Sequence, residues 1–522
     1  MKKEFPFRIH RTEPSGVSIN NFLTEVKMKK IMAVFAILAM VFFVVSCGGD
    51  SKDDDKTDTG DTTVDTGDTQ TDPTDTGDTG ADTGDTGADT GDTTADTGDS
   101  EPDTGDTTAD SGDSEPDTGD TGEGGSWEAK YKKADEHAKK VSENVVKANN
   151  DLGMKMFTKL AAAEAGKNMM ISPLSISIAM AMSTNGASGE NLDEMKKVLG
   201  FGEMELQNVN EQFMHLIASL VAADKDLALS IANSVWMRED FSLDVKAAFT
   251  DVLRDFYNAE IFAEGFTVEN INAWVSEKTN GKIDKIVEEI GEDVVMYLIN
   301  AIYFKAAWTT AFNEKNTYEG TFTLSDGTES TADFMQFTEE EDVPEFLAYY
   351  SDWGEKDGFA MIRLPYGRGV FAFYGIVPNY DNKTKIDEFI AKIAKEGFEH
   401  YYSLITPMSD FPMKLPKFKF KYEKSLVEIF KELGMEKAFE AGGPFNNIAE
   451  DPHDPIISDI KHKTFIEVNE AGTEAAAVTS VEYSDSAIPG GFYADRPFVF
   501  VIRDDRTGSI LFIGKVENPK AE

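Results

Sequence analysis

The chain is poor in the residues from which many catalytic and metal sites are built. Its 522 residues include one cysteine, Cys47, and six histidines that are scattered along the sequence. A single cysteine excludes an intrachain disulfide framework. The Gly-x-Ser-x-Gly, His-Glu-x-x-His and P-loop motifs are all absent. The sequence therefore predicts no enzyme, no catalytic constellation, no metal site and no cofactor.

Positive charge is also scarce. The chain has 95 Asp and Glu against 50 Lys and Arg, which gives a net charge of −45 at pH 7. No basic stripe appears that would attract nucleic acid, heparin-like polymers or anionic lipid. We therefore expect no nucleic-acid partner.

Apolar residues are nearly missing from one long segment, residues 47–125. From Ser51 to Gly125 it repeats Asp-Thr-Gly units, holds 25 acidic residues and contains no aromatic, Leu, Ile or Met. Such a composition cannot bury enough apolar surface to offset chain entropy, and like charges repel one another. We predict an extended, disordered stalk. Weak Ca²⁺ binding by its aspartates and glycosylation of its threonines remain open alternatives.

An apolar run precedes the stalk. Lys27-Met28-Lys29-Lys30 is followed by apolar residues 31–45 and then by Ser46-Cys47-Gly48-Gly49. A basic start, about fifteen apolar residues and small residues at the exit describe a signal peptide better than a membrane span. Val44-Val45-Ser46-Cys47 also resembles a bacterial lipobox, in which Cys47 becomes a lipid-bearing N-terminus.

We therefore divide the N-terminal part into a possible non-native extension, 1–27, and a lipoprotein signal peptide, 28–46. The lipid on Cys47 would be the only contact with a membrane. The expected location is the cell envelope, with the protein lipid-anchored and either surface-exposed or periplasmic. An ordinary cleaved signal followed by secretion is the alternative.

Residues 126–522 show no second linker, repeat or transmembrane run, so we expect one large domain. Periodicity and capping signals predict helices over 129–163, 174–183, 269–279 and 424–433. Alternation and β-branched or aromatic residues predict strands over 227–237, 295–304, 370–377, 414–420 and 498–502. Mixed helices and strands with an all-strand tail indicate an α+β fold with more than one sheet.

One segment near the C-terminus admits two interpretations. Residues 467–478 run through Gly472 into Thr473, Glu474, three alanines and Val478. Thr473 could cap a surface helix, and alanine favours helix over strand. Alternatively, the small side chains would let the segment enter a packed sheet as a strand, in which every second residue faces the interior.

The second interpretation gains weight because the segment resembles the reactive-loop hinge of the serpins, a family of protease inhibitors. Other serpin-like motifs follow in matching order over about residues 150–519, among them 168–176, 232–236, 300–308, 415–418, 433–439, 497–502 and 511–516. Asn191, Ala306 and Ala471 depart from common family residues without adding bulk or charge to the hinge. The resemblance implies a serpin fold, with three β-sheets, about eight or nine helices and an exposed reactive loop.

The same resemblance implies a suicide mechanism. A protease cleaves the loop, is held as an acyl-enzyme, and is distorted when the freed loop inserts into the inhibitor's own sheet. The implied hinge consists of Glu470, Gly472, Thr473, Glu474, Ala475, Ala476, Ala477 and Val478.

The serpin resemblance implies that Ser486–Ala487 is the reactive-centre bond. Counted as in the family's loop, Ser486 lies fourteen residues beyond Gly472 and eleven before Pro497. Tyr483 and Ile488 are alternative cleavage positions. A small residue before the bond suggests an elastase-like or subtilisin-like serine protease as the partner, and Tyr483 would suggest a chymotrypsin-like one.

The resemblance also assigns a structural gate over which the sheet opens, formed by Ser172, Ser175, Asn300, His462 and Trp308. The histidine is expected to hydrogen-bond Asn and Ser and to have no catalytic role. We expect a monomeric inhibitor. The alternative is a non-inhibitory serpin used as a surface-displayed binding or adhesive module, and the small hinge residues favour inhibition.

Overall fold

The computed structural model describes residues 126–337, 348–352, 358–379, 385–408, 411–442, 444–449, 455–473 and 491–521. Several predictions therefore lie outside the described residues: the extension 1–27, the signal peptide 28–46, Cys47, the stalk, the bond Ser486–Ala487 and the hinge residues Glu474, Ala475, Ala476, Ala477 and Val478. Within the described ranges, no helix combines the length and apolar character needed to cross a membrane.

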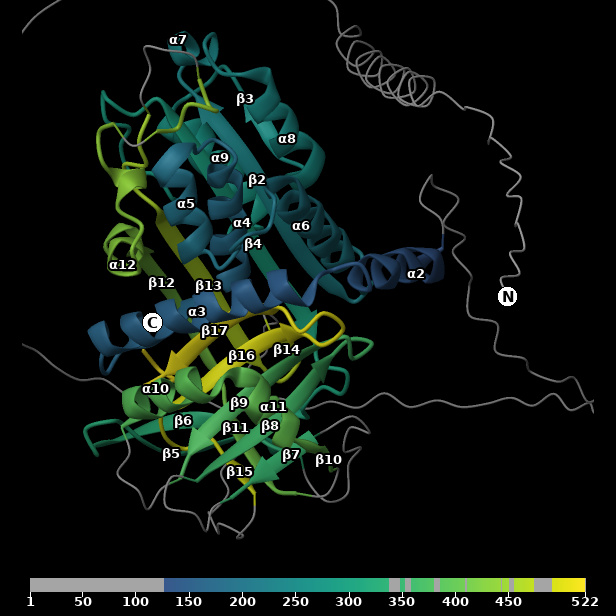
Figure 1. The fold of residues 1–522 in the computed structure, drawn as a ribbon. Coiled ribbons are helices and arrows are strands. Elements are labelled where there is room, and N and C mark those ends of the chain that lie inside the picture. Colours follow the sequence, from purple (N-terminus) through teal and green to yellow (C-terminus); the bar gives the residue numbers. More distant parts are fainter. Residues whose placement is uncertain are drawn as a thin grey trace, which may run out of the picture. The chain divides into compact units, whose positions relative to one another are not determined.

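Three β-sheets organise the domain (Figure 1). Sheet A has, in spatial order, β12 (Phe418–Ser425), β13 (Lys461–Asn469), β14 (Gly472–Thr473), β4 (Met296–Ala307), β2 (Leu227–Met237) and β3 (Glu260–Phe262). Sheet B has β1 (Met169–Ile171), β17 (Ile510–Val516), β16 (Phe498–Asp504), β9 (Phe371–Pro378), β8 (Phe359–Tyr366), β7 (Ala348–Ser351) and β10 (Thr406–Pro407). Sheet C has β15 (Phe492–Tyr493), β11 (Met413–Pro416), β6 (Glu329–Met335) and β5 (Tyr318–Thr323).

The described residues also form eleven α-helices, more than the eight or nine expected. They are α2 (Trp127–Ala138), α3 (Glu143–Ala163), α4 (Pro173–Thr184), α5 (Gly189–Val198), α6 (Leu206–Val221), α7 (Glu239–Ser242), α8 (Ala247–Tyr257), α9 (Val268–Lys278), α10 (Ile386–Glu396), α11 (Phe398–Leu404) and α12 (Val427–Glu432). Short 3₁₀ turns occur at η1 (Glu314–Asn316) and η3 (Lys437–Phe439). A helix as short as α7 spans about one turn, too little for a periodic pattern to reveal it.

Two predicted elements are each divided in the structure. The helix expected over 129–163 breaks before Ser142, whose hydroxyl accepts a hydrogen bond from the Asn144 amide and caps α3. The strand expected over 414–420 breaks at Lys417, where the chain leaves β11 in sheet C and enters β12 in sheet A. By contrast, β2 has the predicted bounds, 227–237.

The middle of β4, in sheet A, is buried on both faces of the sheet. Ile299 and Ala301 contact a small apolar cluster beneath α9 that includes Trp274. Ile302 and Phe304 belong instead to the main core. Because successive strand residues point to opposite faces, α9 covers one face and the main core, including α4, covers the other.

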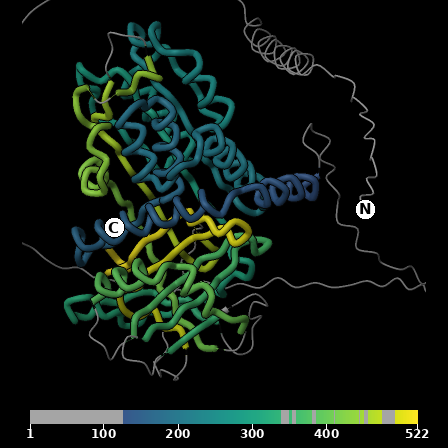
Figure 2. Tube along the Cα trace, viewed as in Figure 1, coloured from purple at the N-terminus to yellow at the C-terminus, as the bar shows by residue number. Residues whose placement is uncertain are grey.

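The beginning and the end of the domain pack together. Figure 2 shows α3, near the start, lying along the yellow C-terminal strands. The Asn149 amide on α3 donates a 3.2 Å hydrogen bond to the Ile510 carbonyl of β17. The last strands of the chain thus complete sheet B against one of the first helices.

Candidate functional site

The hinge begins as a short strand inside sheet A. Strand β14 lies between β13 and β4 and is antiparallel to both. Thr473 is opposite Val468 on one side and Ala306 on the other. At Gly472 and Thr473 the segment is therefore a strand, which is the arrangement that loop insertion requires.

Gly472 is required by close packing. Its φ of 153° lies in a region that side-chain-bearing residues rarely adopt. A Cβ atom here would clash with the backbone carbonyl of Ala306 on the neighbouring strand. Only glycine allows the chain to approach β4 this closely.

Thr473 is 3% exposed and is held by an aromatic pair. Its hydroxyl is 2.6 Å from the Tyr366 hydroxyl. The Tyr366 ring stacks on Trp308 with 4.5 Å between ring centroids. The Trp308 indole N–H donates a 2.8 Å hydrogen bond to the Asn469 carbonyl. Through Tyr366, Trp308 therefore connects the end of β13 to Thr473 of β14.

Glu470, a predicted hinge residue, is a buried anion with partners on three sides. Its Oε1 accepts a 2.7 Å hydrogen bond from the Thr317 hydroxyl, and its Oε2 lies 3.0 Å from the Lys417 ammonium. Its carbonyl accepts from the Phe312 amide at 2.9 Å. These contacts fix the turn between β13 and β14, since a buried charge without them would be costly.

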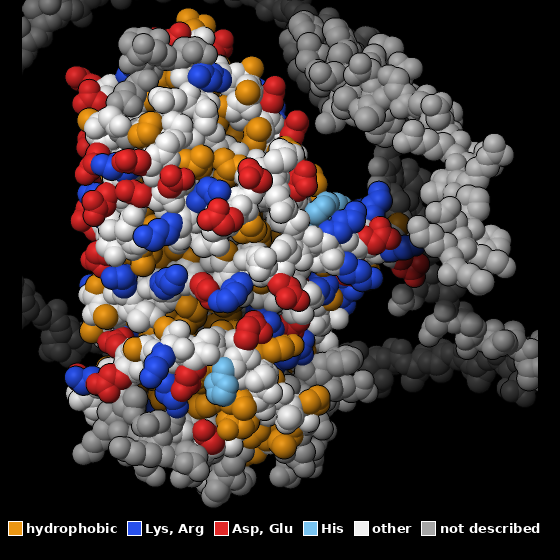
Figure 3. Space-filling model, in the orientation of Figure 1, with side chains coloured by type: hydrophobic (Ala, Val, Ile, Leu, Met, Phe, Trp, Pro, Cys, Tyr) orange, Lys and Arg blue, Asp and Glu red, His pale blue; other side chains and the backbone are white. Residues whose placement is uncertain are grey.

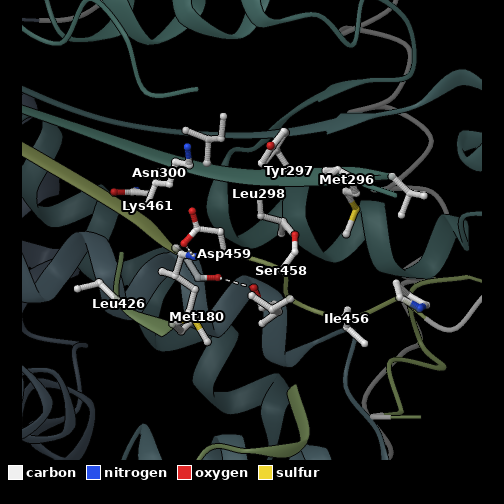
Figure 4. A pocket seen from close by; sticks show the side chains of 18 of the residues that line it. Met180, Met296, Tyr297, Leu298, Asn300, Leu426, Ile456, Ser458, Asp459 and Lys461 are labelled. Atoms are coloured by element: carbon white, nitrogen blue, oxygen red, sulfur yellow. Dashed lines mark hydrogen bonds between the residues drawn. The ribbon is translucent and has the colours of Figure 1, made fainter. Parts of the chain in front are cut away.

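Beyond β14, the described residues show no pairing between β4 and β13. In the described ranges β4 pairs with β2 and β13 pairs with β12, and only the two residues of β14 join β4 to β13. A cavity of about 320 Å³ lies toward the opposite end of these strands (Figure 4). It is bounded by the first half of β4, residues 455–462 and α4, and its lining includes Met180, Met296, Leu298, Asn300, Ile456 and His462.

His462, on the gate, is buried and neutral. Its Nε2 accepts a 3.0 Å hydrogen bond from the backbone N–H of Ser172, so Nδ1 carries the proton. Burial lowers the pKa of His462 to about 4. The Ser172 hydroxyl accepts from the Ser175 amide at 3.1 Å and donates to the Leu511 carbonyl at 2.7 Å. This arrangement places Ser172, Ser175 and His462 together in a structural role.

Asn300 lines the same cavity but differs from its expected bonding. Its amide nitrogen donates to the Asn233 side-chain oxygen at 2.7 Å, while its own side-chain oxygen is buried without a partner. No hydrogen bond joins it to His462, because β4 and β13 are not paired at this level. Sequence reasoning did not select Asn233 or Tyr366, whose roles depend on contacts between distant segments.

Comparisons with known proteins agree with this geometry. The family model described as Serpin (serine protease inhibitor) matches residues 147–519. Serpin-Z10 of Arabidopsis thaliana is 32% identical, over 72% of this chain and 98% of the relative. Serpin A3-7 of Bos taurus is 31% identical, over 72% of this chain and 89% of the relative. The solved native structure of the thermophilic serpin tengpin is 32% identical with a TM-score of 0.62, covering 72% of this chain and 95% of that one.

The chain therefore belongs to the serpin family. The predicted α+β fold with three sheets is confirmed. Members of this family are in general serine protease inhibitors and not enzymes.

Proposed function

We propose that this protein inhibits serine endopeptidases by covalent suicide trapping, with insertion of its reactive loop into sheet A. The observation that carries the proposal is the position of β14. Its two residues already lie between β4 and β13, and among the residues that the structure describes β4 and β13 are not paired with each other beyond it.

The register of β14 indicates where an inserted loop would lie. Thr473 is opposite Val468 and Ala306, so a strand continued by six residues would place Thr479 between His462 and Asn300. The side-chain oxygen of Asn300, which has no partner, would then have a polar neighbour. Insertion to this depth would therefore satisfy a buried acceptor at the gate.

The side chains that insertion would bury are small. Strand periodicity places Ala475, Ala477 and Thr479 on the same face as Thr473, which is buried against Tyr366. No charged residue occupies this face from 473 to 479. The hinge can thus enter the sheet without burying an unpaired charge.

We further propose that the protease cleaves between Ser486 and Ala487. Ser486 lies thirteen residues beyond Thr473. Full insertion of that length would occupy about 40 Å of strand, enough to carry the bound protease along sheet A. A small residue before the bond fits elastase-like or subtilisin-like enzymes, and cleavage after Tyr483 would fit chymotrypsin-like ones.

The N-terminal segments would determine where the inhibitor works. We propose that lipid on Cys47 anchors the protein in the cell envelope and that the acidic stalk holds a monomeric inhibitor away from the membrane. The proposal is supported by the basic and apolar run before Cys47 and by the composition of residues 51–125.

The test is to incubate the purified protein with elastase-like, subtilisin-like, chymotrypsin-like and trypsin-like proteases. Denaturing gels should show a covalent complex, and mass spectrometry of the released C-terminal peptide should begin at Ala487. Cleavage by every enzyme without a complex would refute the inhibitory mechanism and support the non-inhibitory binding module.

A further inference from the structure

Two histidines from separate helices meet at the surface. His137 of α2 and His215 of α6 are 78 residues apart, yet their Nδ1 atoms are separated by only 3.0 Å. Both side chains are partly exposed. Figure 3 shows a histidine at the surface where α2 meets the rest of the domain. Without a metal, one Nδ1 must donate a hydrogen bond to the other.

The two helices are held in place by contacts independent of the histidines. The Ser142 amide, just after α2, donates a 2.5 Å hydrogen bond to the Gln212 side chain on α6. Asp135 of α2 pairs with Arg368 at 2.9 Å and with Arg506 at 3.1 Å. The imidazoles are therefore positioned by the fold before any ligand arrives.

Their separation suits two ligands of one metal ion. Metal–imidazole bonds are about 2.0–2.1 Å, so cis nitrogens at 90° would be about 2.8–3.0 Å apart, and tetrahedral ones about 3.3–3.4 Å. The observed 3.0 Å fits the cis arrangement. Square-planar and tetragonal coordination by nitrogen and oxygen is typical of Cu²⁺ and Ni²⁺.

The surroundings of the pair carry charges of both signs. Lys140 lies near both rings, with Glu136 beside His137 and Glu211 beside His215. Burial, followed by nearby positive charge, lowers the pKa of both imidazoles. No group of three or more His, Cys, Asp or Glu side chains is arranged for a metal in the described part of the chain. The remaining coordination positions would therefore belong to water.

We propose that His137 and His215 together bind one divalent transition-metal ion, Cu²⁺ or Ni²⁺, through their Nδ1 atoms. The bound ion would join α2 to α6. This inference does not depend on protease inhibition. It differs from the sequence-based expectation of no metal site, which was drawn because the six histidines are scattered along the sequence.

The test is to add one equivalent of Cu²⁺ to the full-length protein and to count the coupled imidazole nitrogens by pulsed electron paramagnetic resonance. The two test variants are His137→Gln and His215→Gln. The control is His400→Gln, because His400 is exposed on α11 and lies far from both histidines in the sequence. The acidic stalk offers oxygen ligands only, so it cannot produce the two-imidazole signal.

We expect the wild type and His400→Gln to show two coupled imidazoles. His137→Gln and His215→Gln should each lose that signal and weaken Cu²⁺ affinity at this site by roughly 10–100-fold or more. A two-imidazole signal that persists in either variant would overturn the proposal. So would a wild-type protein that shows oxygen ligands or a single imidazole, which would leave the pair as a hydrogen bond only.

Discussion

Under the proposed mechanism, replacing Thr473 by arginine should convert this protein from an inhibitor into a substrate. Thr473 is 3% exposed, flanked by Val468 and Ala306 and in contact with the Tyr366 hydroxyl. In the uncut variant an arginine here would leave the sheet for solvent, and insertion would then have to bury its guanidinium without a partner carboxylate, at a cost of several kcal/mol. A barrier to insertion raised by about 3 kcal/mol would slow insertion by on the order of 100-fold.

Slower insertion changes the outcome because it competes with deacylation of the protease. The wild type should trap a sensitive protease at about one inhibitor per enzyme, whereas Thr473→Arg should be cleaved at the same bond with little complex formed. Thr473→Val is the matched control. It keeps the β-branched shape and loses mainly the hydrogen bond to Tyr366, about 1 kcal/mol. That bond is already made before cleavage, so its loss should lower the stability of the fold and leave the rate of insertion nearly unchanged.

The assay is the stoichiometry of inhibition, read beside denaturing gels for all three proteins. Urea unfolding of the uncleaved proteins checks that the arginine variant remains folded. If folded Thr473→Arg still trapped protease one to one, then burial of this residue would not limit insertion, and our account of β14 would be wrong.

Four further outcomes are expected. The pKa of His462 is about 4 in the folded protein and 6.5 in the unfolded chain. The folded state therefore loses no stability from this group above pH 6.5, and it loses stability as the pH falls from 6.5 towards 4, because the unfolded chain then binds a proton that the folded protein does not. Urea unfolding should therefore show about 3 kcal/mol less stability at pH 4 than at pH 7 from this group, a loss that His462→Gln should lack. Trp308→Phe removes the hydrogen bond to the Asn469 carbonyl and should lower the free energy of unfolding at pH 7 by about 1–2 kcal/mol, with an unchanged value arguing against the Trp308 contact. Ser486→Arg should redirect inhibition towards trypsin-like proteases, and unchanged selectivity would mean that the reactive bond lies elsewhere. Cys47→Ala should move the protein from the detergent phase to the aqueous phase in a phase-partition assay, and identical partitioning would exclude the lipid anchor.

The sequence by itself determined the elements whose signals are local. Alternation fixed β2 at its observed bounds, and the Ser172-Pro173 start signal located the beginning of α4. The hinge motif indicated a strand at Gly472 and Thr473. Helix propensity alone would have favoured a surface helix with Thr473 as its N-cap. Residues that matched serpin motifs in order also located Ser172, Ser175 and His462, which the fold brings together.

Only the tertiary structure decided the pairings between distant segments. Nothing in residues 414–420 shows that the chain changes sheets at Lys417, and no spacing reveals that Asn300 bonds to Asn233 and not to His462. The meeting of His137 with His215 across 78 residues was equally hidden. Periodicity and capping report on neighbours within a few turns of chain, whereas these contacts depend on which strands and helices pack side by side.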